Sequence, residues 1–185
     1  MKEWIIKNID ITFTTIISAI VGAVFTLLLT NISKSGRLKI YIRNWESHLT
    51  SNVSDGYGGY IEKDDVLNGN CFNYQLIIDV HNTSGKPKIM RDIKVAFYNK
   101  ETTAIELEPN NADKTQKSSQ FSKYAKIGAV NIPEKSIITL SLSGSCCNST
   151  IVKIKESTRI VLKYKNERGK TKKVTISKRG INSKK

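Results

Sequence analysis

Few side chains in this sequence have the types and spacing that catalysis requires. The two histidines are His48, in a long polar segment, and His81, which follows Asp79 near the end of a predicted strand. The sequence contains no GxSxG, GxxxxGK[ST], GxGxxG or HExxH motif for either to serve. The adjacent carboxylates Asp64 and Asp65 have no companions at metal-ligand spacing. We therefore expect no catalytic residue, no metal site and no cofactor.

The cysteines also give no recognisable chemical motif. They are Cys71 and the adjacent pair Cys146 and Cys147, an odd number without CxxC spacing. This pattern predicts neither a disulfide framework nor a zinc site. We interpret Cys71 as a buried core thiol and the pair as loop residues, which weakly favours a reducing compartment.

Positive charge is concentrated at the C-terminal end of the chain. The formal net charge is +14, and the last 36 residues contain 13 Lys or Arg against Glu156 and Glu167. Such a region suits phosphates, either of anionic lipid or of nucleic acid. Because 24 of the 30 basic residues are lysine, AT-rich codon usage is an alternative origin.

Alternation in the closing segment predicts a positive sheet face, with Ile160, Leu162 and Tyr164 on the opposite face. We expect the basic side chains to be solvated and to bind anionic lipid headgroups, with nucleic acid not excluded. The predicted anionic-surface residues are Arg159, Lys163, Lys165, Lys172, Lys173 and Lys178.

A glycine-rich run at 55–60 is a candidate binding loop for a protein partner. It alternates flexible residues with Tyr57 and Tyr60. Aromatic rings provide contact area while glycines let the backbone adapt, although a mobile loop tip has the same composition.

The N-terminal segment has the composition of a membrane span, which would hold the predicted basic face and binding loop near a bilayer. Residues 11–33 carry no charge, and the stretch 11–30 is predominantly apolar. Twenty helical residues at about 1.5 Å each cross a hydrocarbon core of roughly 30 Å. A cleaved signal peptide is the alternative, but residues 1–10 contain Glu3 and Asp10 and no A-x-A-like cleavage site follows. Trp4 suits the headgroup layer as an anchor.

The charges that flank the span predict its orientation. Lys34, Arg37, Lys39 and Arg43 follow the span, whereas only Lys2, Lys7 and the amino terminus precede it. The positive-inside rule therefore predicts a single-pass protein of the cell membrane with residues 34–185 in the cytoplasm.

Small residues along the span favour close approach of two helices. Ser18, Gly22 and Thr26 are spaced four residues apart and share one helix face. This spacing is typical of self-associating spans, so we expect a homo-oligomer through the helix as one option.

Residues 34–185 have the pattern of one antiparallel β domain. Apolar and polar residues alternate at 38–43 and 72–81, and further strands are predicted at 88–99, 103–108, 136–143, 158–165 and 171–178. Turn-forming residues separate these strands, and segments 46–70 and 109–120 are predicted to be long loops. The sequence contains no convincing amphipathic helix between the strands. We predict a mostly β sandwich or barrel.

The stretches LIIDVHNTSGKPKIMRDIKVAFY (76–98) and RIVLKYKNERGKTKKVTI (159–176) support this fold. They resemble the small immunoglobulin- or fibronectin-like domains of uncharacterised bacterial membrane-anchored proteins. The resemblance covers about 40 residues and implies a fold without implying an activity.

Three functions are consistent with these features. The leading hypothesis, reached by elimination, is a membrane-tethered binding or scaffold module without catalytic activity. The second is a membrane effector in which a ligand-sensing β domain drives oligomerisation of the span, similar to effectors of bacterial anti-phage systems. The third is an extracytoplasmic wall- or surface-binding domain, which requires the opposite orientation.

Overall fold

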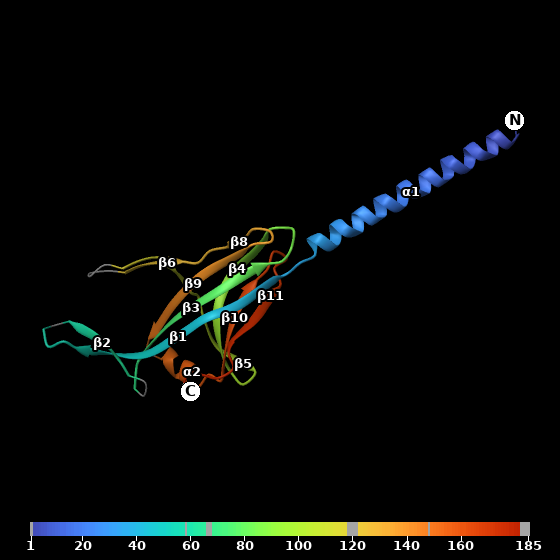
Figure 1. Ribbon diagram of the computed structural model, residues 1–185. Helices are drawn as coiled ribbons and strands as arrows, with labels where there is room; N and C mark the ends of the chain where they lie inside the picture. Colours follow the sequence, from blue (N-terminus) through green and yellow to red (C-terminus); the bar gives the residue numbers. More distant parts are fainter. Residues whose placement is uncertain (1, 58, 66–67, 118–121, 148, 182–185) are drawn as a thin grey trace.

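One long helix precedes a β-sandwich in the computed structural model, which describes residues 2–57, 59–65, 68–117, 122–147 and 149–181 (Figure 1). Helix α1 spans Lys2–Lys34. Its stretch Phe13–Ile32 is long and apolar enough to cross a membrane, and none of it is buried against the rest of the chain. An exposed and predominantly apolar stretch of 20 residues needs an apolar environment from outside the domain.

The hydroxyl groups of Ser18, Thr26 and Thr30 hydrogen-bond to the backbone of α1. Ser18 Oγ donates to the carbonyl of Thr14 at 2.8 Å, and Thr26 Oγ1 donates to the carbonyl of Gly22 at 2.8 Å. Such bonds satisfy polar groups that would otherwise lack a partner in hydrocarbon.

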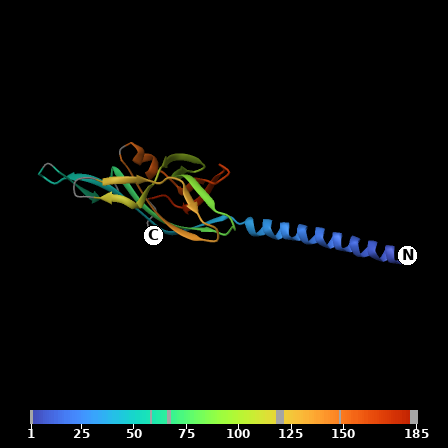
Figure 2. The same cartoon turned by 90° about the horizontal axis from the view of Figure 1, so that it is seen from above.

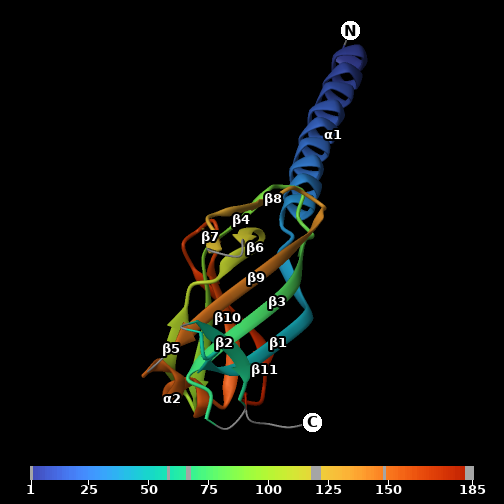
Figure 3. The same cartoon turned by 90° about the vertical axis from the view of Figure 1, so that its left-hand side faces the viewer.

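The soluble part consists of two packed antiparallel sheets (Figure 3). The first has six strands in the order β2-β1-β3-β9-β6-β7, and the second has β11-β10-β4-β5 with β8 paired to β4. The strands are β1 (Leu38–Ser54), β2 (Tyr60–Asp64), β3 (Cys71–Asn82), β4 (Lys88–Asn99), β5 (Thr102–Leu107), β6 (Asn110–Lys117), β7 (Ser122–Lys126), β8 (Val130–Ile132), β9 (Ile137–Cys147), β10 (Arg159–Lys165) and β11 (Thr171–Ser177). The predicted antiparallel sandwich is confirmed.

The core lies between the sheets because alternate residues of each central strand face inward. Phe72, Leu76 and Val80 of β3 are fully buried, as are Val95 and Phe97 of β4. The rings of Phe72 and Phe97 meet edge to face at 5.5 Å between centroids. This packing joins the two sheets at their centre.

The predicted loop at 46–70 is wrong, because β1 continues to Ser54 and forms a hairpin with β2. The register between β1 and β3 shifts between Ile42 and Asn44. Before this bulge the even-numbered residues of β1, such as Ile42, face the core. After it the odd-numbered residues Trp45 and Leu49 do so. The sequence therefore loses its regular alternation where the strand continues.

Two more elements differ from the prediction. Much of the segment predicted as a loop at 109–120 lies in β6, whose polar residues pair with β7 and β9 at the edge of the sheet. Helix α2 (Thr150–Lys155) was not predicted, because six residues are too short for a clear helical period. It buries Ile151 and Ile154.

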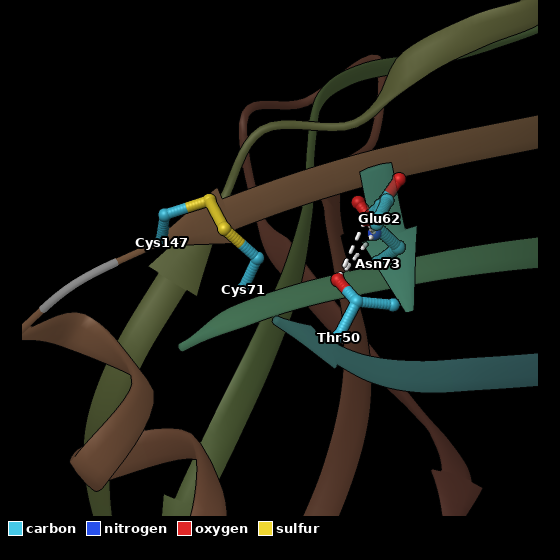
Figure 4. Close-up of a disulfide and its surroundings, with 5 residues drawn as sticks. All are labelled: Thr50, Glu62, Cys71, Asn73 and Cys147. Carbon is cyan, nitrogen blue, oxygen red and sulfur yellow. Dashed lines mark hydrogen bonds between the residues drawn. A yellow bond between two sulfur atoms is a disulfide. The ribbon is translucent and has the colours of Figure 1, made fainter. Parts of the chain in front are cut away.

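The interpretation of Cys71 as a free thiol is also wrong. Cys71 and Cys147 lie opposite each other on β3 and β9 and form a disulfide (Figure 4). Cys146 is free. Adjacent cysteines on a strand point to opposite faces, so only one of the pair can reach Cys71. Burial raises the pKa of the Cys146 thiol to about 11.

Helix α1 extends from one end of the sandwich, roughly along the direction of β1 and β3 (Figures 1 and 2). This helix-proximal end comprises the linker 35–37 and the turns 83–87, 133–136 and 166–170. The disulfide, α2 and the end of β11 lie at the opposite, helix-distal end. The two ends of the sandwich therefore differ in their distance from the apolar helix.

Candidate functional site

Several basic side chains lie on the outer side of the five-stranded sheet. Arg159, Lys163 and Lys165 point outward from β10, while Ile160, Leu162 and Tyr164 are buried as the alternation predicted. Lys173 of β11 lies opposite Lys163 and belongs to the same face. Lys172 lies opposite Tyr164, so it points to the other side of the sheet.

Acidic residues of the same sheet neutralise much of this face. Lys163 Nζ lies 2.6 Å from Glu106 Oε1, and Lys165 Nζ lies 2.9 Å from Asp92 Oδ2. Arg159 lies 4.0 Å from Glu101. The expectation that these side chains are solvated is wrong for Lys163, whose side chain is only 14% exposed.

The ring of Tyr98 lies beneath the basic side chains of this face. The Arg159 guanidinium and the Lys163 ammonium are each 4.9 Å from the ring centroid, and the Lys173 ammonium is 5.5 Å away. Burial by itself would raise the pKa of Tyr98, but Lys163, Thr103 and Lys173 outweigh burial and lower the pKa to about 8. Cations therefore stabilise a tyrosinate at this position.

A sheet hollow of about 690 Å³ adjoins this face, lined by β4, β5, β10, β11 and the segments 108–110 and 126–129. Its basic residues are Arg91, Lys94, Lys126, Lys163, Lys165 and Lys173, and its acidic residues are Asp92, Glu106 and Glu108. The hydrogen bond from Lys163 is the main cause that lowers the pKa of Glu106, which also pairs with Lys94 at 3.3 Å. The sheet hollow therefore carries both positive and negative charges, which makes it less suited to an anionic ligand than a purely basic site.

A second hollow of about 470 Å³ lies where the linker meets the β10–β11 hairpin, and we name it the junction hollow. Its basic residues are Arg37, Lys88, Arg168, Lys170, Lys172 and Lys173. Glu167 is the one acidic residue among those that line it. Lys88 Nζ lies 2.8 Å from Glu167 Oε1, and the other five cations form no ion pair within 4 Å among the described residues.

The hairpin that carries this charge has a fixed tip. Asn166 Oδ1 accepts hydrogen bonds from the backbone N–H groups of Arg168 and Lys170 at 3.1 and 2.9 Å. Gly169 adopts a φ of +73°, which residues with a Cβ rarely adopt. Burial would raise the pKa of Glu167, but the hydrogen bond from Lys88, a backbone hydrogen bond and the nearby positive charges lower it.

The linker at the other side of the junction hollow is held equally closely. The Arg37 N–H donates to Thr83 Oγ1 at 3.1 Å, and the Thr83 N–H donates to the Arg37 carbonyl at 3.2 Å. A Cβ on Gly36 would clash with the backbone of Thr83 and Ser84. The end of α1 and the sandwich are therefore joined by a short, packed connection.

Asn82 is a structural residue of the helix-proximal end that sequence reasoning missed. It is fully buried, and its Nδ2 donates to the carbonyls of Lys86, Ile132 and Pro133. Its Oδ1 accepts hydrogen bonds from the backbone and side chain of Ser84. The turn-forming run NTSGKP after β3 was the available signal, but it did not reveal which side chain is buried.

A polar hollow of about 380 Å³ lies on the outer face of the six-stranded sheet and was not predicted. Glu62 Oε1 accepts hydrogen bonds from Thr50 Oγ1 at 2.6 Å and from Asn73 Nδ2 at 2.5 Å (Figure 4). His48 lies 4.0 Å from Asp64, on the rim formed by the β1–β2 hairpin. These residues come from three strands, whose pairing the sequence pattern did not reveal.

The other predicted residues with described side chains line neither basic hollow. Tyr57 is 97% exposed at the tip of the β1–β2 hairpin, whereas the side chains of Tyr60 and Trp4 lie outside the described residues. Lys178 follows β11 at the helix-distal end. Ser18, Gly22 and Thr26 lie on the exposed surface of α1.

Comparison with known proteins assigns the soluble domain to a family. The family described as YopI Ig-like domain matches residues 36–177. The chain is 29% identical over 175 residues to an SPbeta prophage-derived uncharacterized protein, YopI, of Bacillus subtilis (strain 168), covering 92% of this chain and 97% of that protein.

Two solved structures were also matched, each covering 78% of this chain and 91% of its own chain. They are a putative ApaA protein from Bordetella pertussis and an uncharacterized beta-sandwich protein from Clostridium difficile 630, with 11% and 10% identity and TM-scores of 0.34. The match over residues 36–177 covers more than half of the sequence, and the chain therefore belongs to the YopI Ig-like domain family.

Proposed function

We propose that this protein is a membrane-tethered binding module without catalytic activity. The observation that carries the proposal is the fully exposed apolar stretch Phe13–Ile32, which ends three residues before the linker of a closed β-sandwich. A soluble helix of this composition would bury one face against the domain, whereas a lipid-embedded helix is apolar all round. The immunoglobulin-like family membership supports a binding role for the domain.

The connection between helix and domain supports a tether that holds the domain close to the bilayer. Only residues 35–37 separate α1 from β1, and Gly36 and Arg37 pack against Thr83. A long flexible linker would let the domain search a large volume. This linker instead restricts the domain to partners at or near the membrane surface.

We propose that the domain faces the cytoplasm. The charges after the span support this orientation, and so do the basic residues Lys86, Lys88 and Lys135 that the fold brings to the helix-proximal end. The Cys71–Cys147 disulfide is the observation that favours the opposite side, because disulfides persist mainly in oxidising compartments. The opposite orientation would make the domain a wall- or surface-binding module.

Fractionation of cells that produce the full chain tests the tether. The full chain should remain in membranes washed with alkaline carbonate, and a version lacking residues 1–34 should become soluble. A full chain that carbonate releases would refute the proposal. A reporter active only outside the cytoplasm, attached after Lys185, tests orientation, and strong activity would refute the cytoplasmic assignment.

A second candidate function is that of a membrane effector, in which the β domain drives oligomerisation of the span. This function requires that α1 associates with a second copy of itself. Within the described residues, a Cβ on Gly22 would meet no atom within 4 Å, so the small face of α1 is open. Ser18 and Thr26 lie on the same face, and their hydroxyls are already bonded to the helix backbone. Replacing Gly22 with Leu should abolish cross-linked dimers of the full chain in membranes if this face is the contact.

A further inference from the structure

The junction hollow lies where the proposed tether would bring it to the lipid headgroups. Ile32 ends the apolar stretch, and Gly36 lines the hollow. At about 1.5 Å per helical residue and about 3.3 Å per extended residue, the hollow begins roughly 10 Å from the edge of the hydrocarbon. The headgroup layer occupies roughly 5 to 7 Å of that distance. Long lysine and arginine side chains can cover the remainder.

The direction of the strands excludes the sheet faces from this position. Both sheets run roughly along the direction in which α1 leaves the domain, so their faces point sideways when α1 stands upright in a bilayer (Figures 1 and 3). Of the six predicted anionic-surface residues, Lys178 lies at the helix-distal end and Arg159 begins β10 there. Lys172 lines the junction hollow, and Lys173 lines both the junction hollow and the sheet hollow.

The charge of the junction hollow is available to a ligand. Arg37, Arg168, Lys170 and Lys172 are exposed and have no acidic partner among the described residues. The sheet hollow differs, because Lys94, Lys163 and Lys165 are already paired with carboxylates there. Uncompensated cations within a Debye length of about 8 Å of an anionic leaflet attract its phosphates.

The backbone around the junction hollow holds these cations in a fixed arrangement. Asn166 locks the hairpin tip that carries Arg168 and Lys170, while Thr83 and Gly36 hold the linker that carries Arg37. A preformed concave site loses less conformational entropy on binding than a flexible basic tail does. Phosphate groups are bound well by such convergent donors.

We propose that the junction hollow binds the phosphate of an anionic lipid headgroup and thereby fixes the domain against the bilayer that α1 crosses. The inference rests on the proposed membrane tether. The phosphate lies between the linker and the β10–β11 hairpin, next to the end of α1.

The test uses the full chain purified in detergent, with bound lipid counted by native mass spectrometry. The probes are phosphatidylglycerol, phosphatidic acid and zwitterionic phosphatidylcholine. The unaltered chain should retain the two anionic lipids at least tenfold more tightly than phosphatidylcholine. Equal retention of all three lipids would overturn the proposal.

Matched variants localise the binding. The junction variant Arg168→Gln/Lys170→Gln/Lys172→Gln should weaken phosphatidylglycerol binding at least tenfold. The control variant Lys63→Gln/Lys153→Gln/Lys178→Gln removes the same charge from exposed sites near the helix-distal end and should change binding less than threefold. Equal losses in the two variants would overturn the site, because only total charge would then matter.

Glu167→Gln should increase lipid binding, and misfolding of the domain cannot produce such an increase. It removes the carboxylate that occupies Lys88 and should tighten phosphatidylglycerol binding several-fold. Unchanged or weaker binding in a folded Glu167→Gln chain would count against the hollow. Melting curves of each variant show whether the domain is folded.

Competition separates the sources of phosphate. Glycerol phosphate, inorganic phosphate or duplex DNA that displaces phosphatidylglycerol at equal concentration would overturn the lipid assignment in favour of a soluble phosphate or nucleic acid. Carbonate washing of membranes that contain the junction variant reports the tether independently. If lipid binding is lost while the variant stays in the membrane, the tether holds and the hollow is the lipid site.

Discussion

The Cys71–Cys147 disulfide should make a large contribution to the stability of the sandwich. It closes a loop with a sequence separation of 76 residues between β3 and β9. The chain-entropy relation assigns about 4.5 kcal/mol to a loop of this length, and measured contributions are typically about 2–4 kcal/mol. We therefore expect Cys71→Ala/Cys147→Ala to lower the free energy of unfolding by about 3 kcal/mol.

Urea and thermal denaturation of residues 36–185 measure this effect, with a melting temperature expected to fall by about 6–12 °C. Cys146→Ser is the matched control and should cost about 1 kcal/mol or less, because Cys146 is free and only partly buried. Reductant should destabilise the unaltered domain and leave the double variant unchanged, since Cys147 is exposed. An oxidised domain that is no more stable than its reduced form would refute the reasoning, as would a Cys71–Cys146 bond in peptide maps.

Tyr98, Gly36 and Phe72 offer three further tests of the packing and electrostatics. Ultraviolet titration should show one tyrosine ionising with a pKa near 8, and Lys163→Gln should raise it, because Lys163 is one of the groups that lower the pKa of Tyr98. Since this pKa is below the ordinary value of 10.0, the tyrosinate should add stability as pH rises from about 8 to 10, and a first ionisation at 10 would contradict this. Gly36→Ala should destabilise the domain by about 1–3 kcal/mol in urea unfolding of the full chain, because its Cβ would clash with backbone atoms of Thr83. An unchanged unfolding midpoint would contradict the packed linker. Phe72→Ala should cost about 3–5 kcal/mol because the side chain is fully buried against Phe97, whereas the exposed Ile137→Ala should cost less than about 1 kcal/mol by the same measurement.

The strands with one face on the core could be predicted from the sequence. Period-two alternation at 72–81 and 159–165 gives the inward residues directly, because each apolar side chain lies on the same side of the pleat. The continuation of β1 could not be predicted, since the bulge after Ile42 interrupts that period. The polar strands β6 and β7 pair at the edge of a sheet, where burial leaves little hydrophobic signal.

The candidate site was only partly accessible to sequence reasoning. The face of Arg159, Lys163 and Lys165 follows from alternation within one strand. Its neutralisation by Glu106 and Asp92 depends on β4 and β5, whose pairing with β10 is long-range. The junction hollow has the same origin, because the fold alone brings the linker beside a hairpin about 130 residues later.

The central proposal is that α1 remains on the protein as its membrane anchor. The most direct test is the intact mass of the chain recovered from carbonate-washed membranes. The proposal predicts a membrane-bound chain that still contains the whole span Phe13–Ile32. A mature chain that begins after residue 25, or one that is recovered only in the soluble fraction, would contradict it.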